Sequence, residues 1–179
     1  MDLHELLLQR HSIRRYTADP VDADHVRTIL EAALLAPTSK NARCWQFVVV
    51  EDKDTLARLA DCKPAYAASV KDAAFAVVVT VDPAKSEAYI EDAAFAGAFM
   101  HLQAAALGIG SCWVQVRGRF AADGEPSEDV VRDILAIPAD LVVESIVTFG
   151  YPAETRRPVD PAKLQWEKVH IGTWRHDAE

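Results

Sequence analysis

The sequence predicts an α+β fold, in which four or five strands and several helices form one domain over residues 1–179. Its 179 residues fit the usual domain size of roughly 100–200 residues. Half of the residues are apolar, which is enough to build a sizeable core. Short runs of β-branched residues alternate with segments of helical periodicity, and this alternation predicts the mixed class.

Two helices are expected in the first quarter of the chain, over residues 2–10 and 23–36. In the second, apolar residues recur at helical spacing. Asp22 is a suitable N-cap because its carboxylate can accept from free backbone N–H groups. Pro37 ends this helix, since the residue before a proline avoids helical geometry.

The next segments predict a strand over residues 46–50, two short helices over 54–61 and 64–71, and a second strand over 74–81. The first strand is rich in β-branched residues and has flanking charge. The second is a continuous apolar run, which is typical of a central strand buried on both faces.

The longest helix is expected over residues 88–107. No charged residue occurs between Ala93 and Leu107, so the helix should be buried on more than one side. It would pack on the sheet, and a second subunit could share it. His101 is expected to be a satisfied core histidine rather than a ligand, and Gly108 is the natural C-cap.

The remaining elements are predicted as a strand over residues 113–116, a helix over 128–136 capped by Ser127, and a strand over 142–149. Residues 153–179 carry Trp166 and Trp174, which are unusual in a free tail. We therefore expect this segment to be an extended arm that packs on this subunit or on a partner.

A basic run, Arg10-His11-Ser12-Ile13-Arg14-Arg15, stands out because the chain has a formal net charge of −8. Arginine side chains bind phosphate oxygens in pairs, and a neighbouring hydroxyl adds a neutral donor. The run therefore predicts a phosphate-binding segment, although a solvated helix end is an alternative. An acidic chain with one local basic run favours a small anionic ligand over nucleic acid.

A polar loop, Pro37-Thr38-Ser39-Lys40-Asn41-Ala42-Arg43, lies between a predicted helix and a predicted strand. Rigid elements on both sides would fix its side chains, as in many binding loops, whereas ordinary turn chemistry is the alternative. Glu91 and Asp92 form the nearest thing to a carboxylate pair. They lie near a helix start, where negative charge suits the helix dipole.

Other classes of site lack support in the sequence. The three cysteines have no CxxC spacing, the six histidines have no metal-ligand spacing, and no catalytic triad is evident. The start of the chain does not resemble a signal peptide, and no apolar run is long enough to span a membrane. We expect a cytoplasmic protein without a metal site.

Four segments, in order, resemble motifs of the nitroreductase family of FMN-dependent oxidoreductases. They are Arg10 to Arg14, Pro37 to Phe47, Gly108-Ile109-Gly110-Ser111-Cys112-Trp113, and Gly150-Tyr151-Pro152. The resemblance extends from residue 4 to about residue 170 and is closest to the compact members. It implies a central, mostly antiparallel sheet of four to five strands flanked by helices, and a homodimer with FMN at the subunit interface.

The resemblance also implies which residues bind the cofactor. Arg10, His11, Ser12 and Arg14 would hold the FMN phosphate and ribityl chain. The loop with Pro37, Thr38, Ser39, Asn41 and Arg43 would line the flavin of the other subunit. Trp113, Val114 and Gln115 would border the flavin face that carries N5. Lys163 matches best the basic residue that completes the phosphate site, with Arg156 and Arg157 as alternatives.

The function that the resemblance implies is ping-pong transfer of a hydride, through flavin N5, from NADH or NADPH to a small electron-poor acceptor such as a nitroaromatic or quinone. Alternatives are another flavin reaction, such as dehalogenation or reduction of an activated double bond, flavin binding without useful turnover, and a binding protein for another phosphate ligand. Arg43 and Cys44 depart from the family pattern, in which glutamine and proline are common. The flavin would supply the chemistry, so no separate catalytic residue is expected.

Overall fold

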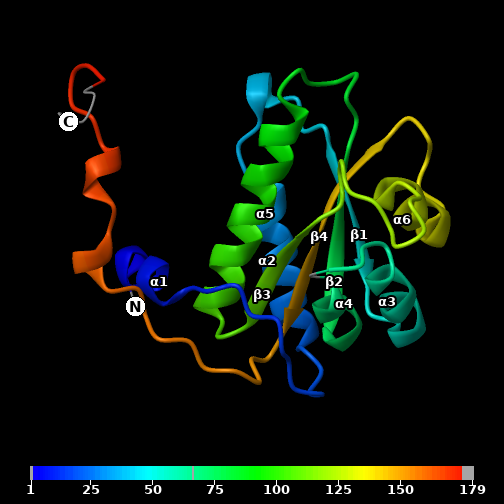
Figure 1. Ribbon diagram of the computed structural model, residues 1–179, viewed down its shortest axis with the longest axis horizontal. Coiled ribbons are helices and arrows are strands. Elements are labelled where there is room, and N and C mark those ends of the chain that lie inside the picture. Colours follow the sequence, from blue (N-terminus) through cyan, green and yellow to red (C-terminus); the bar gives the residue numbers. More distant parts are fainter. Residues whose placement is uncertain (1, 66, 175–179) are drawn as a thin grey trace.

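A four-stranded sheet forms the centre of the computed structural model, which describes residues 2–65 and 67–174. The strands are β1 (Trp45–Val50), β2 (Phe75–Val81), β3 (Gly110–Gln115) and β4 (Val142–Gly150), in the spatial order β1-β2-β4-β3 (Figure 1). Each neighbouring pair is antiparallel. The predicted α+β class and strand number are therefore confirmed.

Strand β2 owes its central position to its composition. All seven of its residues are buried, because helices cover both faces of the sheet. Its neighbour β4 is also almost entirely buried. Continuous apolar sequence is what a strand covered on both faces requires.

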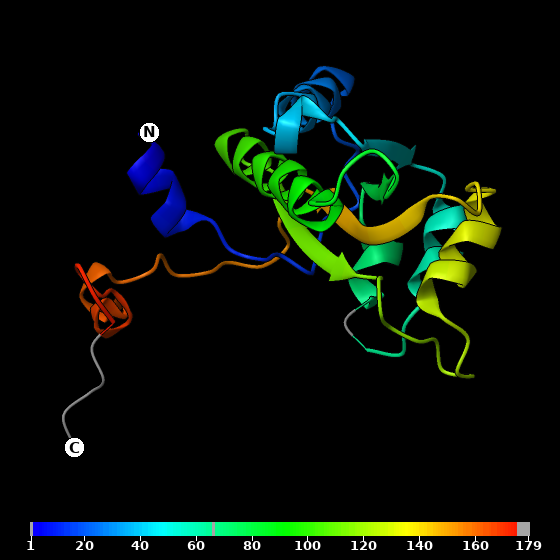
Figure 2. The same ribbon diagram turned by 90° about the horizontal axis from the view of Figure 1, so that it is seen from above.

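Helices form a layer on each side of the sheet (Figure 2). On one side lie α2 (Ala23–Leu34) and α5 (Tyr89–Ala106), which share a core cluster with alternate residues of β2 such as Val77 and Val79. On the other lie α3 (Lys53–Ala60), α4 (Ala68–Asp72) and α6 (Ser127–Leu135), which pack with Ala76 and Val78. Because side chains alternate along β2, successive residues pack into the cores on opposite faces of the sheet.

Helix α5 is not covered on all sides within this chain. Its sheet side is buried at Ala93, Ala96, Gly97 and Met100. Ala94, Phe95 and Ala98 are exposed on the other side, and Phe95 retains 50% of its accessible surface. If a second subunit shares this helix, as its composition allows, it would cover this outer face.

The expected helix ends are mostly confirmed. The Asp22 carboxylate accepts the backbone N–H of Asp24. The C-cap of α5 is Leu107 rather than the expected Gly108, which is the next residue and has φ +73°. The prediction that Ser127 caps the next helix is wrong. Ser127 is the first residue of α6, and its hydroxyl donates to the Cys62 carbonyl at 2.6 Å instead.

Helix α1 (Leu3–Gln9) and the C-terminal arm project from the body of the molecule (Figures 1 and 2). The arm contains the short turns η2 (Pro161–Lys163) and η3 (Trp166–Lys168), and the Val159 N–H donates to the Leu8 carbonyl. Its large apolar side chains are exposed in the single chain: Leu164, Trp166, Val169, Ile171 and Trp174. The arm therefore has little packing against its own subunit.

None of the helices in residues 2–65 and 67–174 combines the length and apolarity needed to cross a bilayer.

Candidate functional site

The basic segment after α1 is extended and lies beside the edge strand of the sheet. Ser12 pairs with Ser111 in a short parallel bridge, and the Ile13 N–H donates to the Ser111 carbonyl at 2.9 Å. Close approach requires glycine at position 110, since a Cβ there would lie 2.9 Å from Ile13. The first and third sequence motifs therefore meet at this edge.

Tyr16 fixes the other end of the segment. A Cβ on Gly150 would lie 2.9 Å from the Tyr16 ring, so glycine is needed here as well. The Tyr16 hydroxyl donates to the Ile13 carbonyl at 2.6 Å and lies 2.7 Å from Thr148 Oγ1. Burial raises the Tyr16 pKa well above its usual value, so the hydroxyl stays protonated.

An open cleft of about 390 Å³ lies where the first, third and fourth motifs meet. Its lining combines α1, the basic segment, the C-terminal end of α5 and the start of the arm, and includes Arg10, His11, Ser111, Glu154 and Arg156. The His11 Nε2 atom is buried and has no hydrogen-bond partner among the described residues. A buried polar atom beside a cleft is available for a ligand that accepts or donates a hydrogen bond.

The Glu154 carboxylate pairs with Arg156, one of the two arginines that line the cleft. Arg156 Nη2 lies 2.8 Å from Glu154 Oε2, and the Arg14 backbone N–H donates to Glu154 Oε1 at 2.8 Å. That backbone hydrogen bond, followed by the Arg156 charge, holds the Glu154 pKa below its ordinary value. Arg14 and Ser12 do not line the cleft, whereas Arg10 and His11 do.

His101 and Ser111 form a pair that the sequence did not single out as functional. His101 Nδ1 lies 2.7 Å from Ser111 Oγ, at the edge of the cleft. Burial, helped by the positive charge of Arg10, lowers the His101 pKa to about 4, so the ring is neutral at pH 7. This contact is consistent with the expectation of a hydrogen-bonded core histidine. The positive charge of Arg10 also acts on the ring.

The polar loop after α2 has an unusual backbone. Lys40, Asn41 and Arg43 all have positive φ, at 50°, 56° and 48°. The 3₁₀ turn η1 (Ser39–Asn41) contains two of them. Left-handed conformations in residues other than glycine cost energy and concentrate at functional loops. Within the loop, Arg43 Nε donates to Asn41 Oδ1 and the Arg43 N–H donates to Thr38 Oγ1.

Asp92 binds both ends of this loop from the first turn of α5. Its Oδ1 accepts the Ser39 N–H at 2.7 Å, and its Oδ2 accepts the Ser86 hydroxyl at 2.9 Å and the Cys44 thiol at 3.4 Å. The carboxylate is buried, with 2% of the residue exposed. The interpretation of Asp92 as a charge that merely suits the helix dipole is therefore incomplete.

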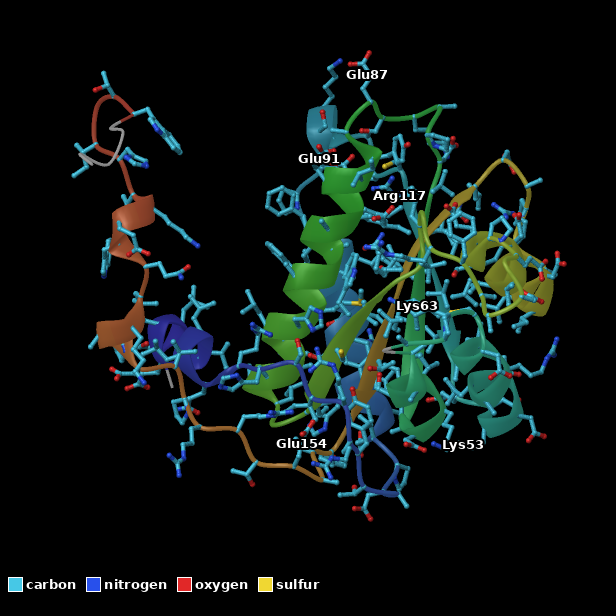
Figure 3. The ribbon with its side chains drawn as sticks, viewed as in Figure 1. Lys53, Lys63, Glu87, Glu91, Arg117 and Glu154 are labelled. Carbon is cyan, nitrogen blue, oxygen red and sulfur yellow. The ribbon has the colours of Figure 1, made fainter. Side chains whose placement is uncertain are left out.

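The cleft and the loop lie at opposite ends of α5. The loop contacts Asp92 in the first turn, whereas Ala105 in the last turn lines the cleft. Thirteen residues at 1.5 Å each separate these positions by roughly 20 Å. Figure 3 shows the labelled Glu91 and Glu154 toward opposite ends of α5. One chain does not bring together the two sets of predicted site residues.

Strand β3 presents Trp113 and Gln115 on one face and Val114 on the other. Trp113 packs on Gly97 of α5, and its Nε1–H donates to Gln115 Oε1 at 2.9 Å. The Gln115 amide in turn donates to the buried Glu144, which pairs with Arg117. The Val114 side chain lies in the second core cluster with 1% exposure, so only its backbone could touch a ligand.

The resemblance offered three positions for the basic residue that completes the phosphate site, and one of them, Arg157, does not line the cleft. Lys163, the best match by motif, lies in η2 of the projecting arm and does not line the cleft of its own chain. Arg156 does line it, next to Glu154. In the part of the chain that the structure describes, no group of three or more His, Cys, Asp and Glu side chains is placed to hold a metal.

Comparison with known proteins gives consistent results. A sequence model of the nitroreductase family matches residues 7–63 and 61–151. The fold is similar to that of an FMN-dependent nitroreductase from Clostridium difficile, with a TM-score of 0.93, 38% identity, and coverage of 96% of this chain and 99% of the other.

Two curated relatives span nearly the whole chain. A protein of Methanothermobacter thermautotrophicus, provisionally named NADH dehydrogenase/NAD(P)H nitroreductase, is 33% identical over 94% of this chain and 88% of its own. An NADH dehydrogenase of Thermus thermophilus is 28% identical over 98% and 97%. With four motifs in the expected order, the matching sheet and these matches, the chain belongs to the nitroreductase family.

Proposed function

We propose that this protein is an FMN-dependent NAD(P)H oxidoreductase that works by a ping-pong cycle. The observation that carries the proposal is the cleft at the first motif, which Arg10, His11 and Arg156 line together, and in which the buried His11 Nε2 has no hydrogen-bond partner among the described residues. Two guanidinium groups and a ring nitrogen fit a dianionic phosphate. The names of the relatives, an FMN-dependent nitroreductase and NADH dehydrogenases, support the choice of flavin.

Each side of the cleft has a distinct role in this proposal. Arg10 and Arg156 attract and orient the phosphate, and His11 Nε2 adds a further hydrogen bond. Ser12 and Arg14 do not line this cleft, so the cleft supports a phosphate contact for Arg10 and His11 among the residues of the first motif. Neutral His101 holds the Ser111 hydroxyl at the rim. When bound, FMN would supply the redox chemistry, which is two-electron transfer through flavin N5 from NADH or NADPH to an acceptor such as a nitroaromatic or quinone.

The remaining predicted residues complete the site only if two copies of the chain associate. Pro37, Thr38, Ser39, Asn41 and Arg43 would then line the flavin bound to the other copy. Two surfaces suit such a homodimer: the outer face of α5, with Ala94, Phe95 and Ala98, and the exposed apolar side chains of the arm. Exposed apolar surface of this kind marks interfaces.

The arm would also carry Lys163 to the second subunit of such a dimer. Because it extends away from its own subunit, it can pack on the partner and place Lys163 near a phosphate site there. Trp113 would border the ring as an apolar wall, with its orientation set by Gln115. Gln115 itself uses both ends of its amide within the chain, so it acts through Trp113.

A visible absorption spectrum recorded without oxygen tests the proposal directly. We expect flavin bands in the purified protein, or after incubation with FMN, that bleach on addition of NADH or NADPH. Bands that neither nicotinamide bleaches would contradict an NAD(P)H oxidoreductase and favour a flavin-binding protein. Absence of flavin bands even with added FMN would overturn the cofactor assignment.

Substitutions test which residues hold the phosphate. We expect Arg10→Ala and Arg156→Ala each to weaken FMN binding by tenfold or more, since a charged hydrogen bond contributes about 1.5–3 kcal/mol. Arg27→Ala is the matched control, because Arg27 is an exposed arginine paired with Glu31 on α2. Lys163→Ala, compared with Arg156→Ala, distinguishes two of the three candidates for the third cation. Equal affinities in all four variants would show that the phosphate binds elsewhere.

A further inference from the structure

The seven-residue loop after α2 needs an external constraint. Three of its residues hold positive φ without being glycine. Its internal hydrogen bonds are short-range: Arg43 binds Thr38 and Asn41, and the N–H groups of Asn41 and Ala42 donate to the carbonyls of Thr38 and Ser39. Lys40, Asn41 and Arg43 are exposed, so packing does not enforce this shape. A loop in strained geometry persists only when its surroundings determine it from outside.

The Asp92 carboxylate supplies that constraint at both ends of the loop. Oδ1 holds the Ser39 backbone N–H at 2.7 Å, and Oδ2 holds the Cys44 thiol at 3.4 Å. Ser86 orients Oδ2 through a hydroxyl at 2.9 Å and also accepts the Ala88 N–H, which ties the carboxylate to the start of α5. A buried carboxylate is retained only where such donors replace water.

We propose that Asp92 is a positioning residue for the cofactor site: it holds the loop from Thr38 to Arg43 in the shape that contacts the flavin. It acts through the backbone and touches neither cofactor nor substrate. The flavin half of this inference rests on the proposed function, whereas the loop half stands on the contacts of Asp92 alone.

Two readouts report on the loop without any cofactor. Lys40 and Arg43 are exposed trypsin sites, and proteolysis requires a flexible segment. Cys44 is buried, and burial together with the Asp92 hydrogen bond raises its thiol pKa to about 11. Release of the loop should therefore accelerate cleavage after Lys40 and Arg43 and also alkylation of Cys44.

The experiment compares Asp92→Asn and Asp92→Ala with wild type. Asparagine keeps one oxygen for the Ser39 N–H, whereas alanine removes every acceptor, so the effects should be graded. Ser127→Ala is the matched control, because Ser127 is a buried hydroxyl that donates to the Cys62 carbonyl far from the loop in the other core. Circular dichroism and urea unfolding establish that each variant is folded; if Asp92→Ala is not, Asp92→Asn and Ser86→Ala decide.

We expect the Asp92 variants to be cleaved after Lys40 and Arg43 at least tenfold faster than wild type without FMN, and to bind FMN about tenfold more weakly, while Ser127→Ala changes neither. Unchanged cleavage and alkylation would overturn the role of Asp92 in the loop. Faster cleavage with unchanged FMN affinity would overturn the link to the cofactor. Wild-type protein that binds no FMN would refute the proposed function and the flavin half together, while the cleavage comparison would still test the loop half.

Discussion

Gly97 on α5 lies directly against the indole of Trp113 on β3. A Cβ at this position would lie 2.3 Å from Trp113 Cζ3 and 2.9 Å from Cε3. Ordinary carbon–carbon contacts lie at about 3.5–4.0 Å, so in Gly97→Ala the indole or the helix must move by more than about 1 Å. Overpacking of this kind costs about 1–3 kcal/mol.

Helix propensity acts in the opposite direction. Alanine is more favourable than glycine within a helix by about 1 kcal/mol. The balance makes Gly97→Ala destabilising by about 1 kcal/mol. With a urea slope of about 2.5 kcal/mol per M, the unfolding midpoint should fall by roughly 0.4 M. The measurement is made at one protein concentration, because any association would shift the midpoint.

A double-mutant cycle with Trp113→Val isolates the contact. Removal of the indole relieves the overlap, so the sign should reverse, and Gly97→Ala should stabilise the Trp113→Val background by about 1 kcal/mol. The resulting coupling energy is about 2 kcal/mol. If Gly97→Ala has the same effect in both backgrounds, the close approach does not exist and the placement of Trp113 against α5 is wrong.

Three further predictions follow from buried polar groups. Protonation of His101 is harder in the folded protein (pKa about 4) than in the unfolded chain (6.5), so its contribution to folding stability is complete above pH 6.5 and is lost as the pH falls toward 4. In urea unfolding at several pH values, His101→Asn should remove roughly 3 kcal/mol of this pH dependence. Parallel curves of stability against pH for the two proteins would refute this prediction. Tyr16→Phe should lower the free energy of unfolding by about 1–3 kcal/mol, because the Ile13 carbonyl and the Thr148 hydroxyl lose their partner. Tyr89→Phe is the control, because the Tyr89 hydroxyl has no hydrogen-bond partner among the described residues. Equal losses in the two variants would contradict the hydrogen bonds assigned to Tyr16. Burial raises the thiol pKa values of Cys44 and Cys62 to about 11, so iodoacetamide at pH 8 should label these thiols only after urea unfolding. Peptide mass spectrometry measures the labelling, and rapid labelling of the native protein would refute their burial.

Elements with strong local patterns were predictable from the sequence. The continuous apolar run of β2 and the helical spacing of α2 both appear within a few residues of the expected bounds. Four motifs in order then predicted the family. These features depend on neighbouring residues or on a known pattern, so no long-range contact had to be foreseen.

The role of Asp92 was missed for a physical reason. Its strongest partner is the backbone N–H of Ser39, 53 positions earlier, and a backbone donor leaves no trace in residue type. The available signal was weak: Asp92 is the last charged residue in the first turn of α5, and the rest of the helix is uncharged. Ser127 was misassigned as a cap for a similar reason, since its hydroxyl serves the distant Cys62 carbonyl.

The exposed side of α5 was also beyond the reach of the sequence. An uncharged helix predicts burial on several sides, but it does not say whether the covering surface belongs to the same chain. The structure leaves Ala94, Phe95 and Ala98 open. The sequence therefore predicted a covering surface without identifying it.

The length of α5 determines which pairing of two chains can complete the proposed site. The loop and the cleft are separated by roughly 20 Å along this helix. A two-fold axis across the middle of its outer face, near Ala98, would run the two helices antiparallel, so that the loop of each chain reaches the cleft of the other. Parallel helices would leave the two halves as far apart as they are in one chain. We therefore expect the complete site to be shared in a symmetric dimer.

Subunit complementation tests this arrangement. Arg10→Ala damages the cleft and Asp92→Ala damages the loop, so homodimers of either variant should bind FMN poorly at both sites. A mixed dimer, with one chain of each variant, can be isolated through two different tags. If each site combines the cleft of one chain with the loop of the other, one site of this dimer carries both substitutions and the other carries neither. We expect one tightly bound FMN per mixed dimer, measured by flavin absorbance against protein content. If the mixed dimer binds as poorly as its parents, each site is built from a single chain, and the antiparallel pairing of α5 is wrong.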